Sequence, residues 1–289
     1  MSHFKNVLIY SDYNKHKNTG CIPTVITAEE IALYIEKIPP APAVVQEALN
    51  HARAGDLTKA SKSASEDPAL RLYLKTLINR PIYGFRNEVS DVAQIFGILG
   101  LGASQQTLYN YLLSLLTPKK WELFSLTNHQ FYDLQASISK HWEAILVHLK
   151  INDKEIQSAI SLIPASIIVC EALFAKRKTE VAQLRCVKAL DFNTILFRLS
   201  GSDLFDLSGE IARKWEMPER ISKLIKSASG MDQTLTGQER VLAQWMHLLL
   251  FYELSQSAFV SAGLNEFIDF KIEFVQDIYE SFAQVVQNT

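Results

Sequence analysis

The sequence predicts an all-α protein, a two-lobed helical bundle with a small N-terminal β-hairpin. Apolar residues recur at helical spacing through most of the 289 residues. Capping residues and prolines stand where these periodic stretches begin, and glycine or proline follows several of them. Only the first part of the chain carries the β-branched runs typical of strands. We therefore expect a hairpin extension in residues 1–27, an N-terminal helical lobe in residues 28–117 and a C-terminal helical lobe in residues 118–289.

The predicted hairpin depends on two β-branched runs, Asn6–Tyr10 and Cys21–Thr27, which flank a polar turn region. Thr27 and Glu30 then have the spacing of a capping box, in which a hydroxyl and a carboxylate each satisfy a free backbone N–H group at a helix start. We expect a helix over residues 28–37 directly after the hairpin.

Three prolines follow that helix, at Pro39, Pro40 and Pro42. They hold the chain extended, and Pro42 stands near the first turn of the next helix, where a missing N–H group costs nothing. That helix has one apolar face of about three turns and is stopped by Gly55. Asp56 can cap the helix after it.

The pair Asp67-Pro68 is a sharper start signal. The carboxylate of Asp67 can accept hydrogen bonds from free N–H groups, and Pro68 fits the first helical position. Further along, we expect Ser90 to cap a helix over residues 91–99 that Gly100 stops.

Apolar periodicity predicts the remaining helices as well. They are expected at residues 104–116, 123–149, 154–175, 204–217, 219–228, 237–258 and 265–287. The longest uncharged stretch, residues 156–170, is shorter than the roughly 20 residues that a membrane span needs and contains Pro164. We interpret it as a buried helix.

Composition excludes several classes of protein. Twenty-nine basic and 31 acidic residues give a net charge of −2, and the basic residues are scattered, which argues against a nucleic-acid partner. Three widely separated cysteines fit a reducing compartment rather than a disulfide framework. The N-terminus lacks the apolar core of a signal peptide, so we expect a cytoplasmic protein without a membrane partner.

The order and spacing of the proline, Asp-Pro, Asn and Tyr-Gly residues resemble the HDOD family, the HD-related output domain of bacterial signalling proteins. The resemblance covers about residues 30–230 and is strongest from Pro39 to Gly100, although Arg80-Pro81 stands where the family usually has small residues. The family-motif positions, which are candidates for partner binding, are Pro39, Pro40, Pro42, Asp67, Pro68, Asn79, Tyr83 and Gly84. We interpret Asp67 as a cap and Asn79 as a corner, with binding as the alternative.

The resemblance also relates the chain to HD-type metal-dependent phosphohydrolases, whose His and Asp side chains hold divalent cations. This chain contains no His-Asp dipeptide. The ligand positions of the family correspond to Ala144, Pro164, Ala165 and Ser227, and the side chains of Pro and Ala have no lone pair to offer. The C-terminal lobe is therefore expected to be a degenerate HD-like fold with no catalytic residue, no metal and no cofactor.

His141 and His148 are seven residues apart, so they share a helix face, with Glu143 nearby. This polar cluster could supply metal ligands. A pair of partly exposed helix histidines is the simpler interpretation.

Three functions follow as hypotheses. The first is a non-catalytic regulatory protein of bacterial signalling that contacts signalling proteins through residues 38–85 and the cleft between the lobes. The second is a phosphohydrolase of nucleotides or cyclic dinucleotides with an altered metal site that uses His141, Glu143 and His148. The third is a sensor that binds a nucleotide ligand in the vestigial cleft without cleaving it.

Overall fold

The structure is a computed structural model, and it describes residues 26–179, 181–183, 190–232, 234–268 and 270–287. Every regular element in this part of the chain is a helix, which confirms the all-α prediction. The predicted hairpin lies in residues 5–27, and all but its last two residues fall outside the described residues.

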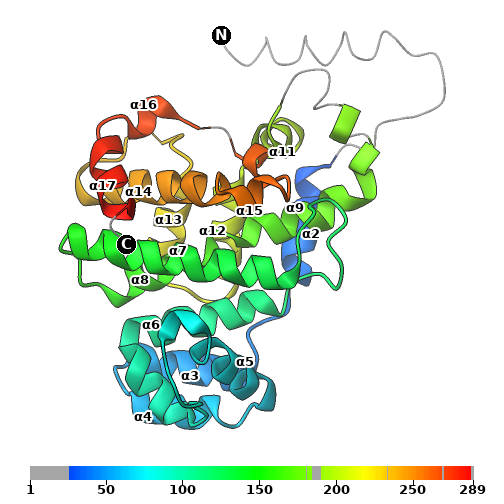
Figure 1. The fold of residues 1–289 in the computed structure, drawn as a ribbon. Helices are drawn as coiled ribbons and strands as arrows, with labels where there is room; N and C mark the ends of the chain where they lie inside the picture. Colours follow the sequence, from blue (N-terminus) through cyan, green and yellow to red (C-terminus); the bar gives the residue numbers. More distant parts are fainter. Residues whose placement is uncertain (1–25, 180, 184–189, 233, 269, 288–289) are drawn as a thin grey trace, which may run out of the picture.

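The N-terminal helices are α2 (Ala28–Lys37), α3 (Ala43–Arg53), α4 (Leu57–Ala64), α5 (Pro68–Ile78), the 3-10 helix η2 (Pro81–Tyr83) and α6 (Val92–Ser114). The C-terminal helices are α7 (Asn128–His148), α8 (Lys154–Ala159), η3 (Ile160–Leu162), α9 (Ala165–Phe174), η4 (Ala175–Arg177), α11 (Phe192–Ser200), α12 (Leu204–Lys214), α13 (Glu219–Ser227), α14 (Gly237–Leu254), α15 (Ser257–Val260), η5 (Leu264–Glu266), α16 (Ile272–Val275) and α17 (Tyr279–Gln287). Helices α3 to α5 pack around α6 at one end of the molecule (Figure 1). Helix α6 leads into a larger body made by α7 to α17. Helix α2 packs on α11 and α12 of that body. The lobe boundary at residue 117 stays a prediction.

Local capping explains where the N-terminal helices begin. The carboxylate of Asp67 accepts hydrogen bonds from the backbone N–H groups of Ala69 and Leu70 at 2.7 and 3.0 Å, as expected. The expected cap at Ser90 is wrong. Helix α6 begins one residue later, so the side chain that reaches the free N–H group of Gln94 belongs to Asp91, at 2.7 Å.

Gly100 interrupts α6 rather than ending it. Its φ of 71° and ψ of 179° belong to backbone space that only glycine reaches easily, so the helix breaks there as the sequence predicts. The chain turns helical again at once and continues to Ser114. The short gap expected before residue 104 is therefore absent.

Longer helices predicted in the C-terminal part are divided. The helix expected from residue 123 begins at Asn128, after a capping box of Thr127 and Gln130. The helix expected over residues 154–175 is divided into α8, η3 and α9 around Pro164, which has no N–H group to continue the backbone ladder. The expected helix over residues 265–287 forms three short helices, η5, α16 and α17.

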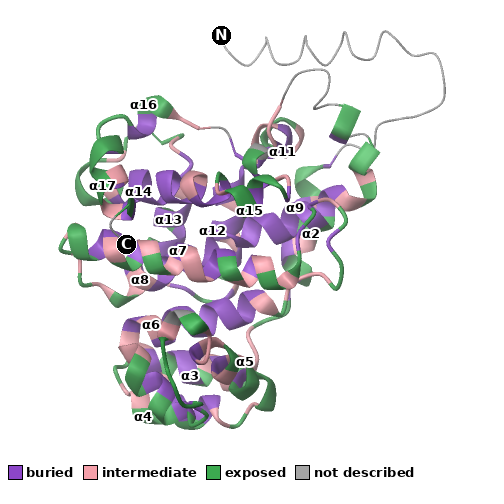
Figure 2. Ribbon diagram, viewed as in Figure 1, coloured by how far each residue is buried: buried purple, intermediate pink, exposed green. Residues whose placement is uncertain are grey.

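The core runs through the middle of the larger body, along α9, α12 and α14 (Figure 2). The indole rings of Trp142 and Trp245 are among its largest buried side chains. Residues 154–177 are the one described segment that is long and apolar enough to cross a membrane, yet 89% of its apolar window is buried inside the protein. It is a core segment, as expected.

Candidate functional site

The proline stretch contacts the turn that follows α12. The indole Nε1–H of Trp215 donates to the carbonyl of Pro39 at 3.2 Å, and Nζ of Lys214 donates to the carbonyl of Glu36 at 3.1 Å. Two stretches that are 176 residues apart in sequence therefore meet. This contact fixes the end of α2 and the start of the N-terminal helices to α12.

Helix α3 holds the same turn from the other side. Nη2 of Arg53 donates to the Tyr109 hydroxyl at 2.5 Å and to the carbonyl of Glu216 at 3.0 Å, while Nε2 of Gln46 donates to the Glu216 carboxylate at 2.7 Å. Glu216 has a φ of 57°, a left-handed conformation that is costly for a residue with a side chain. In this conformation, both the backbone carbonyl and the side-chain carboxylate of Glu216 accept hydrogen bonds from α3.

Asn79 forms a corner at the end of α5. Its side-chain Nδ2 donates to the carbonyls of Lys75 and Val89 at 2.8 and 2.7 Å, and its Oδ1 accepts from the N–H group of Val89 at 2.8 Å. These bonds close the loop over residues 80–88. The side chain of Asn79 is thus occupied with backbone groups of its own lobe.

The closed loop lies against α7 of the larger body. Nη1 of Arg80 is 3.4 Å from a carboxylate oxygen of Asp133 on α7. Gly84 ends η2 with a φ of 66°. Burial raises the pKa of the half-buried Tyr83, with Arg80 lowering it and Glu143 of α7 raising it. The loop over residues 80–88, which we call the motif loop, therefore contacts α7, the helix that also carries the candidate residues His141, Glu143 and His148.

The residues that we expect at the family's ligand positions lie on three different elements. Ala144 is half-buried on α7, and Pro164 and Ala165 are buried at the start of α9. The hydroxyl of Ser227 donates to the carbonyl of Lys223 within α13, at 2.8 Å. Among the described residues, no group of three or more His, Cys, Asp and Glu side chains could hold a metal ion. These residues do not fit an HD-type metal centre.

His141 and His148 both face α14, in agreement with their shared helix face. Nδ1 of His141 pairs with the buried carboxylate of Glu253, and the ring of His148 lies 5.5 Å from that of Trp245. Glu143 is exposed and acts electrostatically on Tyr83 instead. The three polar candidates therefore have different surroundings and do not converge on one point.

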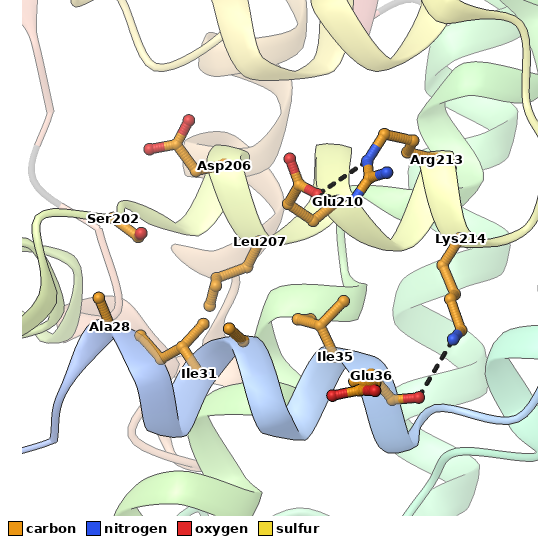
Figure 3. A pocket seen from close by; sticks show the side chains of 11 residues that line it. Ala28, Ile31, Ile35, Glu36, Ser202, Asp206, Leu207, Glu210, Arg213 and Lys214 are labelled. Atoms are coloured by element: carbon orange, nitrogen blue, oxygen red, sulfur yellow. Dashed lines mark hydrogen bonds and ion pairs between the residues drawn. The ribbon is translucent and has the colours of Figure 1, made fainter.

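A groove of about 510 Å³ lies between α2 and α12 (Figure 3). Ile31 and Ile35 of α2 and Leu207 of α12 form its apolar part. Its two cationic side chains are already engaged, because Arg213 pairs with Glu210 at 2.8 Å and Lys214 donates to a backbone carbonyl of α2. We therefore expect no strong attraction for anions there.

Glu171 is a buried residue that the sequence analysis did not single out. Its carboxylate accepts hydrogen bonds from the backbone N–H groups of Glu122 at 2.5 Å, Leu123 at 3.0 Å and Phe124 at 3.1 Å. It thereby holds the segment between α6 and α7. A single charge within the apolar run of α9 was the available signal, because a buried charge needs partners.

Asp203 and His247 are two further buried titratable groups. Burial raises the pKa of Asp203 to about 6, with the Asp206 carboxylate adding to the rise and Lys271 opposing it. Burial lowers the pKa of His247 to about 4, although its Nδ1 lies 2.9 Å from the carbonyl of Ala228. Asp203 caps α12, and the ring of His247 on α14 stacks on the ring of Phe205 in the first turn of α12. Both are parts of the core.

Comparison with known proteins agrees with this description. The family model of the HDOD domain matches residues 38–230, which is most of the chain. No curated protein matches the chain.

Three solved structures share its fold at low sequence identity. An HDOD domain protein with unknown function from Geobacter sulfurreducens superposes with a TM-score of 0.62 at 14% identity, over 90% of this chain and 95% of that one. The "Putative phosphohydrolase" from Shewanella amazonensis gives a TM-score of 0.61 at 14% identity, over 89% of this chain and 96% of its own. The "Putative signal transduction protein" from Marinobacter aquaeolei gives 0.62 at 16% identity, over 99% of this chain and 64% of its own.

Proposed function

This chain belongs to the HDOD family, and from that premise we propose that it is a non-catalytic regulatory module that acts in the cytoplasm through contacts with signalling proteins. The proposal is supported by the chemistry of the side chains that we assign to the family's ligand positions. Ala144, Pro164 and Ala165 offer no donor atom, and the hydroxyl of Ser227 is bonded to its own helix. In the part of the chain that the structure describes, no imidazole and carboxylate groups converge to hold a cation that could activate a water for phosphoester hydrolysis.

The motif loop is the surface that we assign to the partner. Phe85 directly follows Gly84 and is 44% exposed, and Leu72 on α5 is 65% exposed. Aromatic side chains such as that of Phe85 are enriched in protein interfaces. The Arg80–Asp133 ion pair ties this loop to α7, so a partner bound here would act on both parts of the molecule.

A phosphohydrolase acting on nucleotides or cyclic dinucleotides is the second candidate. It is supported by the similarity to the Shewanella "Putative phosphohydrolase" and by the His141–Glu253 pair, which would have to rearrange into a metal site with His148 and Glu143. A nucleotide sensor that binds without cleavage is a variant of the same idea. Both require a ligand in the cleft between the lobes.

Metal content and hydrolysis distinguish these functions. The purified chain is loaded with Mn²⁺ or Fe²⁺, measured by elemental analysis and assayed with bis-p-nitrophenyl phosphate. The regulatory proposal expects no stoichiometric metal and a rate equal to that of the buffer. Stoichiometric metal together with turnover that is lost in His141→Ala but kept in His129→Ala, an exposed histidine of the same helix, would overturn it.

Partner contact is tested separately, with a photo-crosslinking amino acid in the full chain in its own host. Placed at Phe85, it should give a discrete crosslink to a signalling protein identified by mass spectrometry. Placed at Val147, which is 73% exposed on α7, it should give none. Identical products from both positions would count against the motif loop as the docking surface.

A further inference from the structure

A second groove runs along α2 on the face opposite to the groove of Figure 3. Leu33, Tyr34 and Lys37 line it from α2, at the helical spacing that places them on one stripe. Lys176 and Arg177 line it from η4, at the end of α9. Its volume of about 540 Å³ is in the range of small-molecule sites, roughly 300–1,000 Å³.

Positive charge exceeds negative charge in this groove. Both carboxylate oxygens of Glu30 lie 3.0 Å from Nη2 of Arg177, so these two groups neutralise each other. Lys37 and Lys176 are exposed and have no ion-pair partner within the described part of the chain. Among the residues that the structure places, two cationic charges therefore stay uncompensated. The groove of Figure 3 differs, because its arginine and lysine are engaged.

Arg177 lines the groove and is held in place by its hydrogen bonds, but one of its N–H groups has no partner among the described residues. Its Nη1 donates to the carbonyl of Leu173 at 2.9 Å. Its Nε is buried and has no acceptor among the residues that the structure describes. A buried guanidinium donor without an acceptor is uncommon and favours an anion as neighbour.

We propose that this groove binds a phosphate monoester that carries an apolar or aromatic group. A phosphate monoester has a charge of about −1.5 to −2 near neutral pH, which matches the two free lysines. The Tyr34 hydroxyl adds a donor, since burial raises its pKa and keeps it protonated. Leu33 is 53% exposed beside the groove and offers apolar contact to the organic part of the ligand. This site is separate from the cleft between the lobes and does not depend on the proposed function.

The ligand would compete with Glu30 for Arg177. A phosphate that reaches the guanidinium must displace the carboxylate or share its donors, so Glu30 weakens binding in the free protein. Removing the charge of Glu30 should therefore tighten binding, while removing a lysine should weaken it. Opposite signs from neighbouring residues are hard to produce by general loss of structure.

Isothermal titration calorimetry on the full chain tests the site with adenosine monophosphate as the probe. Inorganic phosphate and adenosine serve as comparisons for the anionic and the aromatic part. We expect adenosine monophosphate to bind more tightly than either part. Lys37→Ala and Lys176→Ala should each weaken binding about tenfold, as for the loss of a charged hydrogen bond. Glu30→Gln should tighten it severalfold.

Lys62→Ala is the matched control, because Lys62 is an exposed lysine on the distant helix α4. Its affinity should equal that of the unmodified chain, and circular dichroism verifies that all variants are folded. The proposal is overturned if adenosine monophosphate does not bind, if adenosine binds equally well, or if Lys62→Ala reduces affinity as much as the groove variants do.

Discussion

Three polar side chains of the N-terminal helices and one of the larger body form hydrogen bonds over different distances in sequence. In the N-terminal helices, Asp56 and Asp67 hold N–H groups two or three residues away, and Asn79 reaches ten residues to Val89. In the larger body, Glu171 holds backbone groups 47 to 49 residues away. The first kind of bond fixes a local turn at a partly wet surface. The second kind fixes separate segments to each other in the core, where an unpaired group is far more costly.

The largest effect is expected when the buried carboxylate of Glu171 is removed. Glu171→Ala leaves the N–H groups of Glu122, Leu123 and Phe124 without their acceptor in a partly or fully buried place. We expect the free energy of unfolding to fall by about 4 kcal/mol, since each lost charged or buried hydrogen bond costs about 1–3 kcal/mol. Urea denaturation measures this change.

Two variants sharpen this result. Glu171→Gln keeps one acceptor oxygen but turns an N–H donor toward the backbone donors, so its loss should be intermediate. Glu280→Ala removes an exposed glutamate from the first turn of α17 and should have little effect. A loss in Glu171→Ala no larger than in Glu280→Ala would show that the carboxylate does not hold the segment between α6 and α7.

Opposite pH effects are expected from the two buried groups near α12. The pKa of His247 is about 4 in the folded chain and about 6.5 when unfolded, so the unfolded state binds a proton first as pH falls. His247 therefore removes up to about 3 kcal/mol of stability between pH 6.5 and 4. The pKa of Asp203 is about 6 when folded and about 3.9 when unfolded, so the folded state binds its proton first. Asp203 therefore adds a similar amount of stability as the pH falls from 6 to 4.

The two effects partly cancel in the unmodified chain, and single variants separate them. Asp203→Asn should leave the His247 effect, so stability falls more steeply with acid than in the unmodified chain. His247→Gln should leave the Asp203 effect, so stability falls less steeply. Chemical denaturation at pH 4 to 7 gives the slopes, and only the slopes are compared because each variant also changes stability directly. Slopes that change in the same direction for both variants would contradict this assignment.

The sequence predicts the N-terminal helices well because the residues that start and stop these helices act locally. The carboxylate of Asp67, the fixed φ of Pro68 and the free backbone of Gly100 act within a few residues, so spacing alone reveals them. The Ser90 cap fails by one residue because Ser90 and Asp91 are both good caps and the sequence does not show which one the helix start uses. The division of α8 from α9 could have been predicted from Pro164.

Non-local contacts are what the sequence could not predict. It identifies Pro39 as a motif residue but contains no signal that the carbonyl of Pro39 accepts a hydrogen bond from the indole of Trp215. It places His141 and His148 on one face, yet their partners on α14 depend on tertiary packing. It also leaves the groove between α2 and η4 unseen, because Lys37 and Lys176 are 139 residues apart, counted from their positions in the sequence. Candidate sites built from segments that are distant in sequence thus needed the structure.

The smallest of the effects expected here concerns the Asn79 corner, where the two regions touch. Asn79→Ala removes three hydrogen bonds to Lys75 and Val89, but Asn79 is only half-buried, and water can replace part of what is lost. We expect a loss of about 2 kcal/mol in urea denaturation, and faster hydrogen exchange at the N–H group of Val89. Asn50→Ala is the matched control, because the side-chain oxygen of Asn50 accepts one exposed hydrogen bond from Arg53 at 3.3 Å and alanine favours helix.

The extent of faster hydrogen exchange shows how the two regions are coupled. If exchange becomes faster beyond residues 80–89, in α7, the Arg80–Asp133 ion pair depends on the corner, and the two regions are coupled through the motif loop. If exchange rises only within the loop, the corner serves the N-terminal helices alone, and the coupling must run through Trp215 and Pro39 instead.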